Sequence, residues 1–124
     1  MKELKSFELC CAYLGIEPFL PDVSQLSDDF AKALVSNYKL WVIAKAWNKK
    51  DGFAPDYDNW NQPKYYPYFY KRPSGFAFGR SAYDRTFAVA GSGSRLSFKT
   101  PARAKDFGEM FIDLHNDVLL INIK

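Results

Sequence analysis

The residues that could carry acid–base or metal chemistry are few in this chain of 124 residues. Its only histidine, His115, lies between Asp113 and Asp117. On a helix, positions two apart point about 200° away from each other, so these three side chains cannot converge on one metal ion. A serine or cysteine nucleophile would need the same lone histidine as its base. We therefore expect a solvated helix face here, with no metal, no cofactor and no catalytic residue.

Two weaker patterns also bear on catalysis and ligand binding. Loop acids beside aromatic residues leave general acid–base catalysis open as a minor alternative, although such acids are also common turn formers. These acids are Asp56, Asp58 and Asp84. The sequence GSGSR at 91–95 is similar to a phosphate loop, but its glycines lead into a predicted strand and not into a helix. We expect a hairpin turn there and a non-enzymatic protein.

Residues 61–80, NQPKYYPYFYKRPSGFAFGR, hold seven aromatic rings and four cationic side chains, with no acid among them. Such rings can stack on unpaired bases while the cations neutralise phosphates. Tyr, Trp and Arg are equally typical of protein interfaces, and aromatic pairs also hold small sheets together. The stretch is therefore either a recognition surface or the core of a sheet. The basic residues that could neutralise phosphates are Lys64, Lys71, Arg72, Arg80, Arg85, Arg95 and Lys99.

Alternation along YYPYFY separates the rings into two sets. A strand places Tyr66, Tyr68 and Tyr70 on one face, and Tyr65 and Phe69 on the other. A sheet covered by helices on one side can bury only one of these sets. The predicted binding residues are Tyr66, Tyr68, Tyr70, Arg72 and Arg80.

Composition and charge are typical of a soluble globular domain. Nearly half of the residues are apolar (48%), a quarter are charged and the net charge is +3, so the sequence predicts one compact domain over residues 1–124. The two cysteines, Cys10 and Cys11, are adjacent and cannot build a disulfide framework, which favours a reducing compartment. The chain shows no signal-peptide pattern and no apolar stretch long enough to span a bilayer. We expect a cytoplasmic protein with no membrane partner.

Helical periodicity marks two segments in the first half of the chain. Ser6 is a predicted N-cap for a helix that runs to about Leu14 and ends at Gly15. Ser27 is predicted to cap a second, long helix that ends near Gly52. The stripe of this helix expected to face the core is Leu34, Val35, Tyr38, Trp41, Val42 and Ala46.

A final helix is predicted after Thr100 and Pro101, which form an N-cap and first-turn pair. Its apolar stripe is predicted to be Phe107, Phe111, Leu114, Val118 and Ile121. We assign Trp41 and Phe111 to the core.

Between these helices, residues 65–99 change to the period of two that is typical of strands. GSGS at 91–94 is predicted to turn the chain before a last strand, RLSFK, whose Leu96 and Phe98 face inward. Two earlier strand faces are predicted from Phe76, Phe78, Arg80 and Ala82, and from Phe87 and Val89. The order of elements predicts an α+β fold with two N-terminal helices, a small antiparallel β-meander, and a C-terminal helix packed on one face of the sheet.

Several segments together resemble a known family. They are LPDVSQL, NYKLWVIAKAWN, PDYDNWNQPKYYPYF, GSRLSFKT and AKDFGEMFIDLHNDVLL. In the same order and over nearly the whole chain, they are similar to a family of small uncharacterised proteins from prophages and other mobile elements of Bacteroides and related gut bacteria. That family tends to have Trp where this chain has Tyr57 and Tyr68, which is a conservative difference. The resemblance implies a phage or mobile-element setting and no particular activity.

These observations favour two functions. The first is a non-enzymatic accessory protein of a prophage or mobile element that binds a protein partner, or a second copy of itself, through the aromatic loop Phe53–Tyr70 and the adjacent sheet face. The second is a small single-stranded nucleic-acid-binding protein that uses exposed Tyr and Arg side chains. Nucleic-acid binding requires these side chains to share one face, whereas a protein interface is expected to be an exposed apolar patch with charges at its rim. An enzyme that uses loop carboxylates is a third, weaker hypothesis.

Overall fold

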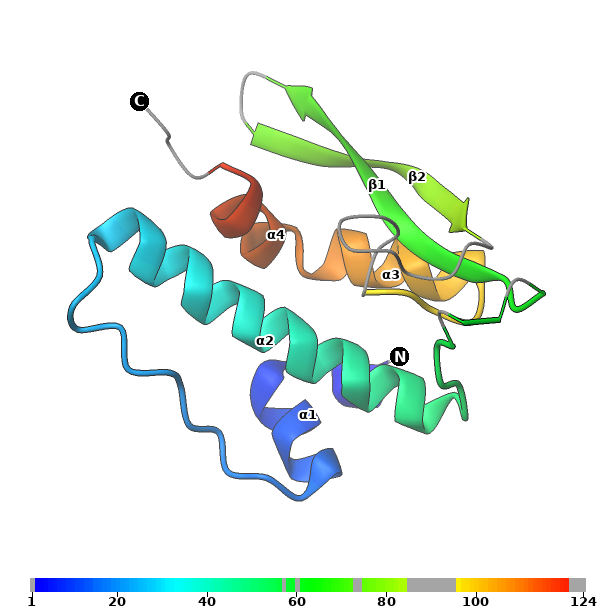
Figure 1. The fold of residues 1–124 in the computed structure, drawn as a ribbon, viewed down its shortest axis with the longest axis horizontal. Coiled ribbons are helices and arrows are strands. Elements are labelled where there is room, and N and C mark those ends of the chain that lie inside the picture. The colour runs from blue at the N-terminus through cyan, green and yellow to red at the C-terminus, as the bar shows by residue number, and fades with distance from the viewer. Residues whose placement is uncertain (1, 57, 60, 73–74, 85–95, 121–124) are drawn as a thin grey trace.

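The computed structural model describes residues 2–56, 58–59, 61–72, 75–84 and 96–120 (Figure 1). Within these ranges the chain is mostly helical. In chain order the elements are the 3-10 helix η1 (Lys2–Leu4), α1 (Phe7–Leu14), α2 (Asp28–Lys50), β1 (Lys64–Arg72), β2 (Gly75–Asp84), α3 (Pro101–Met110) and α4 (Ile112–Leu119).

The long helix α2 lies in the middle of the fold (Figure 1). It contacts α1 on one side and α4 on another. The hairpin of β1 and β2 lies beyond α3 and α4 and contacts both of them. Because α2 is covered from two directions, its buried side chains form more than one stripe.

The predicted first helix is confirmed by α1 and both of its caps. The Ser6 side chain accepts a hydrogen bond from the N–H of Leu9 at 3.2 Å. Gly15 has a φ of 72°, in the left-handed region that favours glycine, and its N–H donates to the carbonyl of Ala12 at 3.1 Å. Local sequence therefore determines where α1 begins and ends.

The predicted second helix is confirmed by α2, but its predicted stripe is wrong in part. Trp41, which we assigned to the core, is 50% exposed, and Leu34 is exposed as well. The largest buried side chains of α2 are instead Leu40, Ile43 and Trp47, spaced three and four residues apart. They are buried because α4 packs against α2 on this side and the ring of Phe107 from α3 contacts Trp47. Two members of the predicted stripe are buried: Val42 and Ala46.

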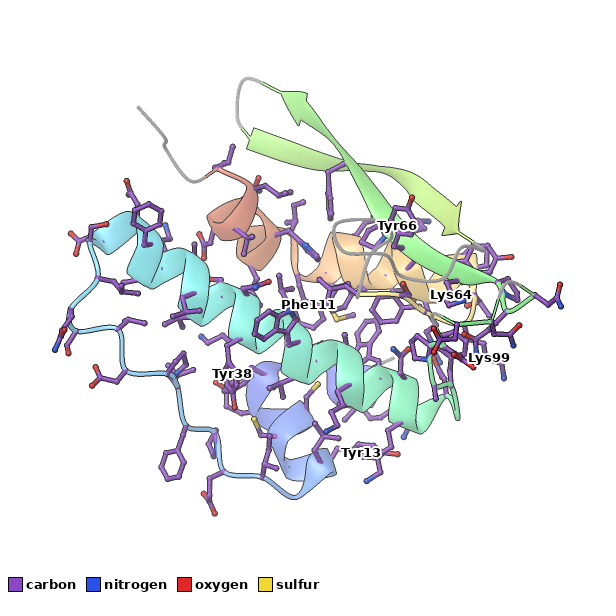
Figure 2. The ribbon with its side chains drawn as sticks, in the orientation of Figure 1. Tyr13, Tyr38, Lys64, Tyr66, Lys99 and Phe111 are labelled. Carbon is purple, nitrogen blue, oxygen red and sulfur yellow. The ribbon has the colours of Figure 1, made fainter. Side chains whose placement is uncertain are left out.

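An aromatic cluster around Trp47 forms the centre of the core. The indole is fully buried and makes edge-on contacts to Phe98, Phe107 and Phe111, with ring centroids 6.2, 5.8 and 5.7 Å away. Its Nε1–H donates to the carbonyl of Leu4 at 2.9 Å. Phe111 is buried as predicted, and Figure 2 shows it between α2 and the helices α3 and α4.

The predicted final helix starts as expected but is interrupted. Thr100 caps α3, because its side chain accepts a hydrogen bond from the N–H of Arg103 at 3.2 Å, and Pro101 is the first helical residue. The φ of −114° and ψ of 32° at Phe111 are not helical, so α4 begins anew at Ile112. The last member of the predicted stripe, Ile121, lies outside the described residues.

The predicted β-meander is wrong, and with it the predicted fold class. Among the described residues only β1 and β2 pair as strands, in one antiparallel hairpin. The predicted last strand contributes a single bridge between Tyr65 and Phe98, with N–H···O distances of 3.0 and 2.7 Å. Thr100 already caps α3, so too few residues follow Phe98 to extend a ladder. The predicted GSGS turn and the strand with Phe87 and Val89 lie outside the described residues.

Candidate functional site

The five predicted binding residues all belong to the hairpin: Tyr66, Tyr68, Tyr70, Arg72 and Arg80. Its register pairs Tyr68 with Arg80, whereas the next residue, Phe69, pairs with Phe78. Gly79 is thus an extra residue in β2, a β-bulge. Directly paired residues occupy the same side of a sheet, so the backbone places position 80 on the side of position 68. Of the five side chains, the structure describes that of Tyr66, which is partly exposed.

The bulge also overturns one predicted strand face. Strict alternation placed Phe78 and Arg80 on the same face of β2. The extra residue Gly79 reverses the alternation, so Phe78 is paired with an inward position of β1 and Arg80 with an outward one.

The other face of β1 lies toward the helices. Tyr65 packs against the core, and the ring of Phe69 lies 4.7 Å from the ring of His115 on α4. Of the two sets of rings predicted from alternation, the set with Tyr65 and Phe69 is therefore the inward one.

Lys64 does not serve as a phosphate contact. It is fully buried at the start of β1 (Figure 2). Its Nζ donates to the carbonyls of Asn59 and Gln62, both at 3.1 Å. The ammonium therefore holds the preceding loop against the hairpin. Lys99, another predicted phosphate contact, is exposed.

His115 is not on a solvated helix face, contrary to the sequence prediction. It is buried between the rings of Phe69 and Phe107, with centroid distances of 4.7 and 5.1 Å. Its Nε2 is buried and has no hydrogen-bond partner among the described residues. Burial lowers the pKa of His115 from 6.5 to about 4, and a backbone hydrogen bond at Phe107 opposes this only in part. His115 follows Phe111 by four residues, and this helical spacing is the signal that could have placed it on the buried face.

The two adjacent cysteines are buried in the core, as small apolar residues of α1. Burial raises the pKa of the Cys10 thiol to about 11, with a smaller contribution from Cys11. Burial also raises the pKa of the Cys11 thiol. Both side chains are therefore protonated thiols at neutral pH and poor nucleophiles.

A different surface leaves large apolar side chains in water. On α2, Phe30 is 55% exposed, Leu34 is 38% exposed and Trp41 is 50% exposed. Spacings of four and seven residues place the three in nearly the same direction, and we call them the α2 stripe. The segment before α2 adds further exposed apolar residues: Ile16, Phe19, Leu20 and Leu26.

Two grooves flank the end of this stripe and share the side chains of Trp41, Lys45 and Lys49. These three residues, spaced four apart on α2, form a ridge between the grooves. One groove, of about 560 Å³, is also lined by Leu14, Ile16, Tyr38 and Val42. The other, of about 520 Å³, is also lined by Ala44, Asn48, Phe53, Ala54, Pro55 and Leu96.

Lys45 and Lys49 make the ridge positively charged, and no acid lines either groove within the described ranges. Lys45 and Lys49 are exposed and form no ion pair with any described residue. The Lys49 ammonium lies 5.7 Å from the ring centroid of Tyr13, a cation–π contact. A ridge of one aromatic and two cationic side chains, with a hollow on each side, can bind an amphipathic surface that carries acids.

The α2 stripe was missed because its residues are apolar and helically spaced, as core residues are. Periodicity shows which residues share a face, but it does not show which face the rest of the chain covers. The signal that remained in the sequence was the excess of large apolar residues in the segment before α2, where Phe19 is 76% exposed.

Comparison with protein-family models, curated proteins and solved structures gave no match to this chain. Within the described ranges, no cluster of three or more His, Cys, Asp or Glu side chains could hold a metal ion. None of the described helices is both long enough and apolar enough to cross a membrane.

Proposed function

We propose that this chain is a protein-binding module whose recognition surface is the α2 stripe with its two flanking grooves. One observation carries the proposal: Phe30, Leu34 and Trp41 are large exposed apolar side chains that point in nearly the same direction from α2, and Trp41 lies between two hollows. Exposed apolar patches with a polar rim are typical of interaction sites, and a half-exposed Trp is the residue type that most often dominates binding energy. Lys45 and Lys49 provide the rim at one end.

The proposed role is accessory rather than catalytic, in the cytoplasm and in the service of a prophage or mobile element. The mobile-element setting is supported by the sequence resemblance alone. The proposed binding surface lies on α2 and not on the loop Phe53–Tyr70. This loop lines one of the two grooves through Phe53, Ala54 and Pro55.

Photo-cross-linking in the cells from which the gene comes tests this proposal. A photoreactive phenylalanine analogue replaces Trp41 in one variant and Met110 in a matched control, because Met110 is an exposed apolar residue on α3. We expect a covalent protein adduct from position 41, suppressed when Leu34→Glu is added, and none from position 110. No adduct from position 41, or equal adducts from both positions, would contradict the proposal.

A second candidate function, binding of single-stranded nucleic acid, is supported by the register of the hairpin. The bulge at Gly79 brings position 80 opposite position 68, on the same side of the sheet as Tyr66. We expect labelled single strands to bind with a Kd of about 1 µM at low salt, and more weakly as salt rises, because phosphate contacts release counterions. Loss of binding in Tyr68→Ala with Arg80→Ala, measured by fluorescence anisotropy, would assign it to this face. Equal affinity in that variant would exclude the face.

A further inference from the structure

The groove of about 520 Å³ beside Trp41 has a polar residue at its floor. The α2 residues that line it are spaced three and four apart and therefore point in similar directions: Trp41, Ala44, Lys45, Asn48 and Lys49. Trp41, Lys45 and Lys49 are exposed, whereas Ala44 and Asn48 are buried. Asn48, two helical turns after Trp41, thus lies at the bottom of the groove with 8% of its surface exposed.

The side-chain amide of Asn48 makes only part of its hydrogen bonds. Its Nδ2 donates to the carbonyl of Ser97 at 2.8 Å. Because a carbonyl can only accept, this contact fixes the orientation of the amide and leaves Oδ1 as an acceptor. Oδ1 is buried, and no described residue donates to it. Buried acceptors are rarely left unpaired, so the floor of the groove offers an acceptor to the N–H or O–H group of a bound molecule.

The remaining lining of the groove combines aromatic walls with a cationic edge. Trp41 and Phe53 supply the aromatic side chains. Lys45 and Lys49 are exposed at the edge, and none of the described acids lines the groove. The volume of about 520 Å³ lies within the range of roughly 300–1,000 Å³ that is typical of small-molecule sites. Such sites pair apolar walls with a few polar groups that orient the ligand.

We propose that this groove binds a small aromatic anion that carries an N–H donor. The ring of the ligand packs against Trp41 and Phe53, its anionic group pairs with Lys45 and Lys49, and its N–H donates to Oδ1 of Asn48. The inference goes beyond the proposed function, because the ligand is a small molecule and not a protein.

A fluorescence titration of the purified full chain tests the chemistry of the ligand. The probe is the dye anilinonaphthalene sulfonate, in the isomer whose amine and sulfonate lie at opposite ends of the naphthalene. We expect saturable binding at one site per chain. The N-methyl analogue lacks the donor and a second analogue lacks the sulfonate, and each is expected to bind about tenfold more weakly. No saturable binding, or an analogue that binds as tightly as the dye, overturns the inference.

Variants assign each group of the dye to its residue. Asn48→Leu is expected to remove the difference between the dye and its N-methyl analogue, because neither then has an acceptor. Lys45→Gln with Lys49→Gln is expected to remove the difference between the dye and the analogue without the sulfonate. These comparisons are ratios within one variant, so a general loss of affinity does not imitate them. Differences that persist in the variants overturn the assignment.

A matched pair of wall substitutions locates the site. Phe53 lines only this groove, and Ile16 lines only the groove of about 560 Å³ on the other side of Trp41. Phe53→Gln is expected to weaken dye binding about tenfold, and Ile16→Gln to leave it unchanged. Far-UV circular dichroism verifies that both variants are folded. Equal effects of the two substitutions overturn the inference.

Failure of the inference and failure of the proposed function are distinguishable. A chain that binds no dye but forms a protein cross-link from position 41 overturns the ligand site and leaves protein binding standing. A chain that binds the dye at Phe53 but forms no cross-link has the opposite meaning.

Discussion

The buried imidazole of His115 makes the stability of this protein depend on pH. The ring is packed between Phe69 and Phe107, and no residue that the structure describes hydrogen-bonds to its buried Nε2. Protonation would place a cation in this apolar environment, which is why burial lowers the pKa from its ordinary 6.5 to about 4. The imidazole therefore binds a proton more weakly in the folded state than in the unfolded state.

The sign and size of the effect follow from this difference in pKa. At pH values well above 6.5 the imidazole is neutral in both states and contributes nothing to the pH dependence. Between pH 6.5 and about 4 the unfolded state binds more protons, so stability falls as the pH falls. One pH unit corresponds to about 1.4 kcal/mol, and the loss across this range is about 3 kcal/mol, with no further loss from this group below it.

Urea unfolding of the wild type and His115→Leu at a series of pH values measures this loss. The variant is not expected to lose the His115 contribution, whereas carboxylates with lowered pKa, such as Glu3 and Asp22, titrate in both proteins and cancel in the comparison. Proton NMR of the only histidine gives its pKa directly. Parallel stability curves for the two proteins, with a histidine pKa near 6.5, would refute the burial of His115.

Three further predictions concern burial. Trp47→Ala is expected to cost about 3–5 kcal/mol in urea unfolding, because its indole is fully buried. Trp41→Ala is expected to cost about 1 kcal/mol, because its indole is half exposed. Equal costs would contradict the assignment of Trp47 to the core. Lys64→Met leaves two loop carbonyls without their donor and is expected to cost about 2 kcal/mol in the same assay, so an unchanged midpoint would place Lys64 in solvent. Cys10 and Cys11 are expected to react with a thiol reagent only after unfolding, because both thiols are buried, and immediate reaction of the folded chain would contradict that burial.

The helix ends could be predicted from sequence because their signals are local. Ser6 and Thr100 hydrogen-bond to backbone N–H groups three residues ahead, and Gly15 adopts a backbone conformation that favours glycine. None of these contacts depends on another part of the chain. The interruption at Phe111 was not predicted, because the apolar spacing continues across it without a Gly or Pro to mark a break.

The sheet and the buried polar residues could not be predicted, because they depend on distant parts of the chain. The segment RLSFK alternates as a strand does, yet Phe98 packs against Trp47 and only one bridge forms with β1. The local sequence predicts a surface cation at Lys64, whereas its ammonium donates to the carbonyls of Asn59 and Gln62. In both cases the deciding partner lies outside the local pattern.

The error at Trp41 itself supports the proposed interface. α2 carries two apolar stripes, and each is long enough and regular enough to read as a core face. The fold covers the stripe of Leu40, Ile43 and Trp47 and leaves the one with Leu34 and Trp41 in water. Burying apolar area contributes about 25 cal/mol per Å² to the free energy of folding, and an exposed stripe gains none of this. A second core-like face that the described part of the chain does not cover is best explained as a face that another protein covers.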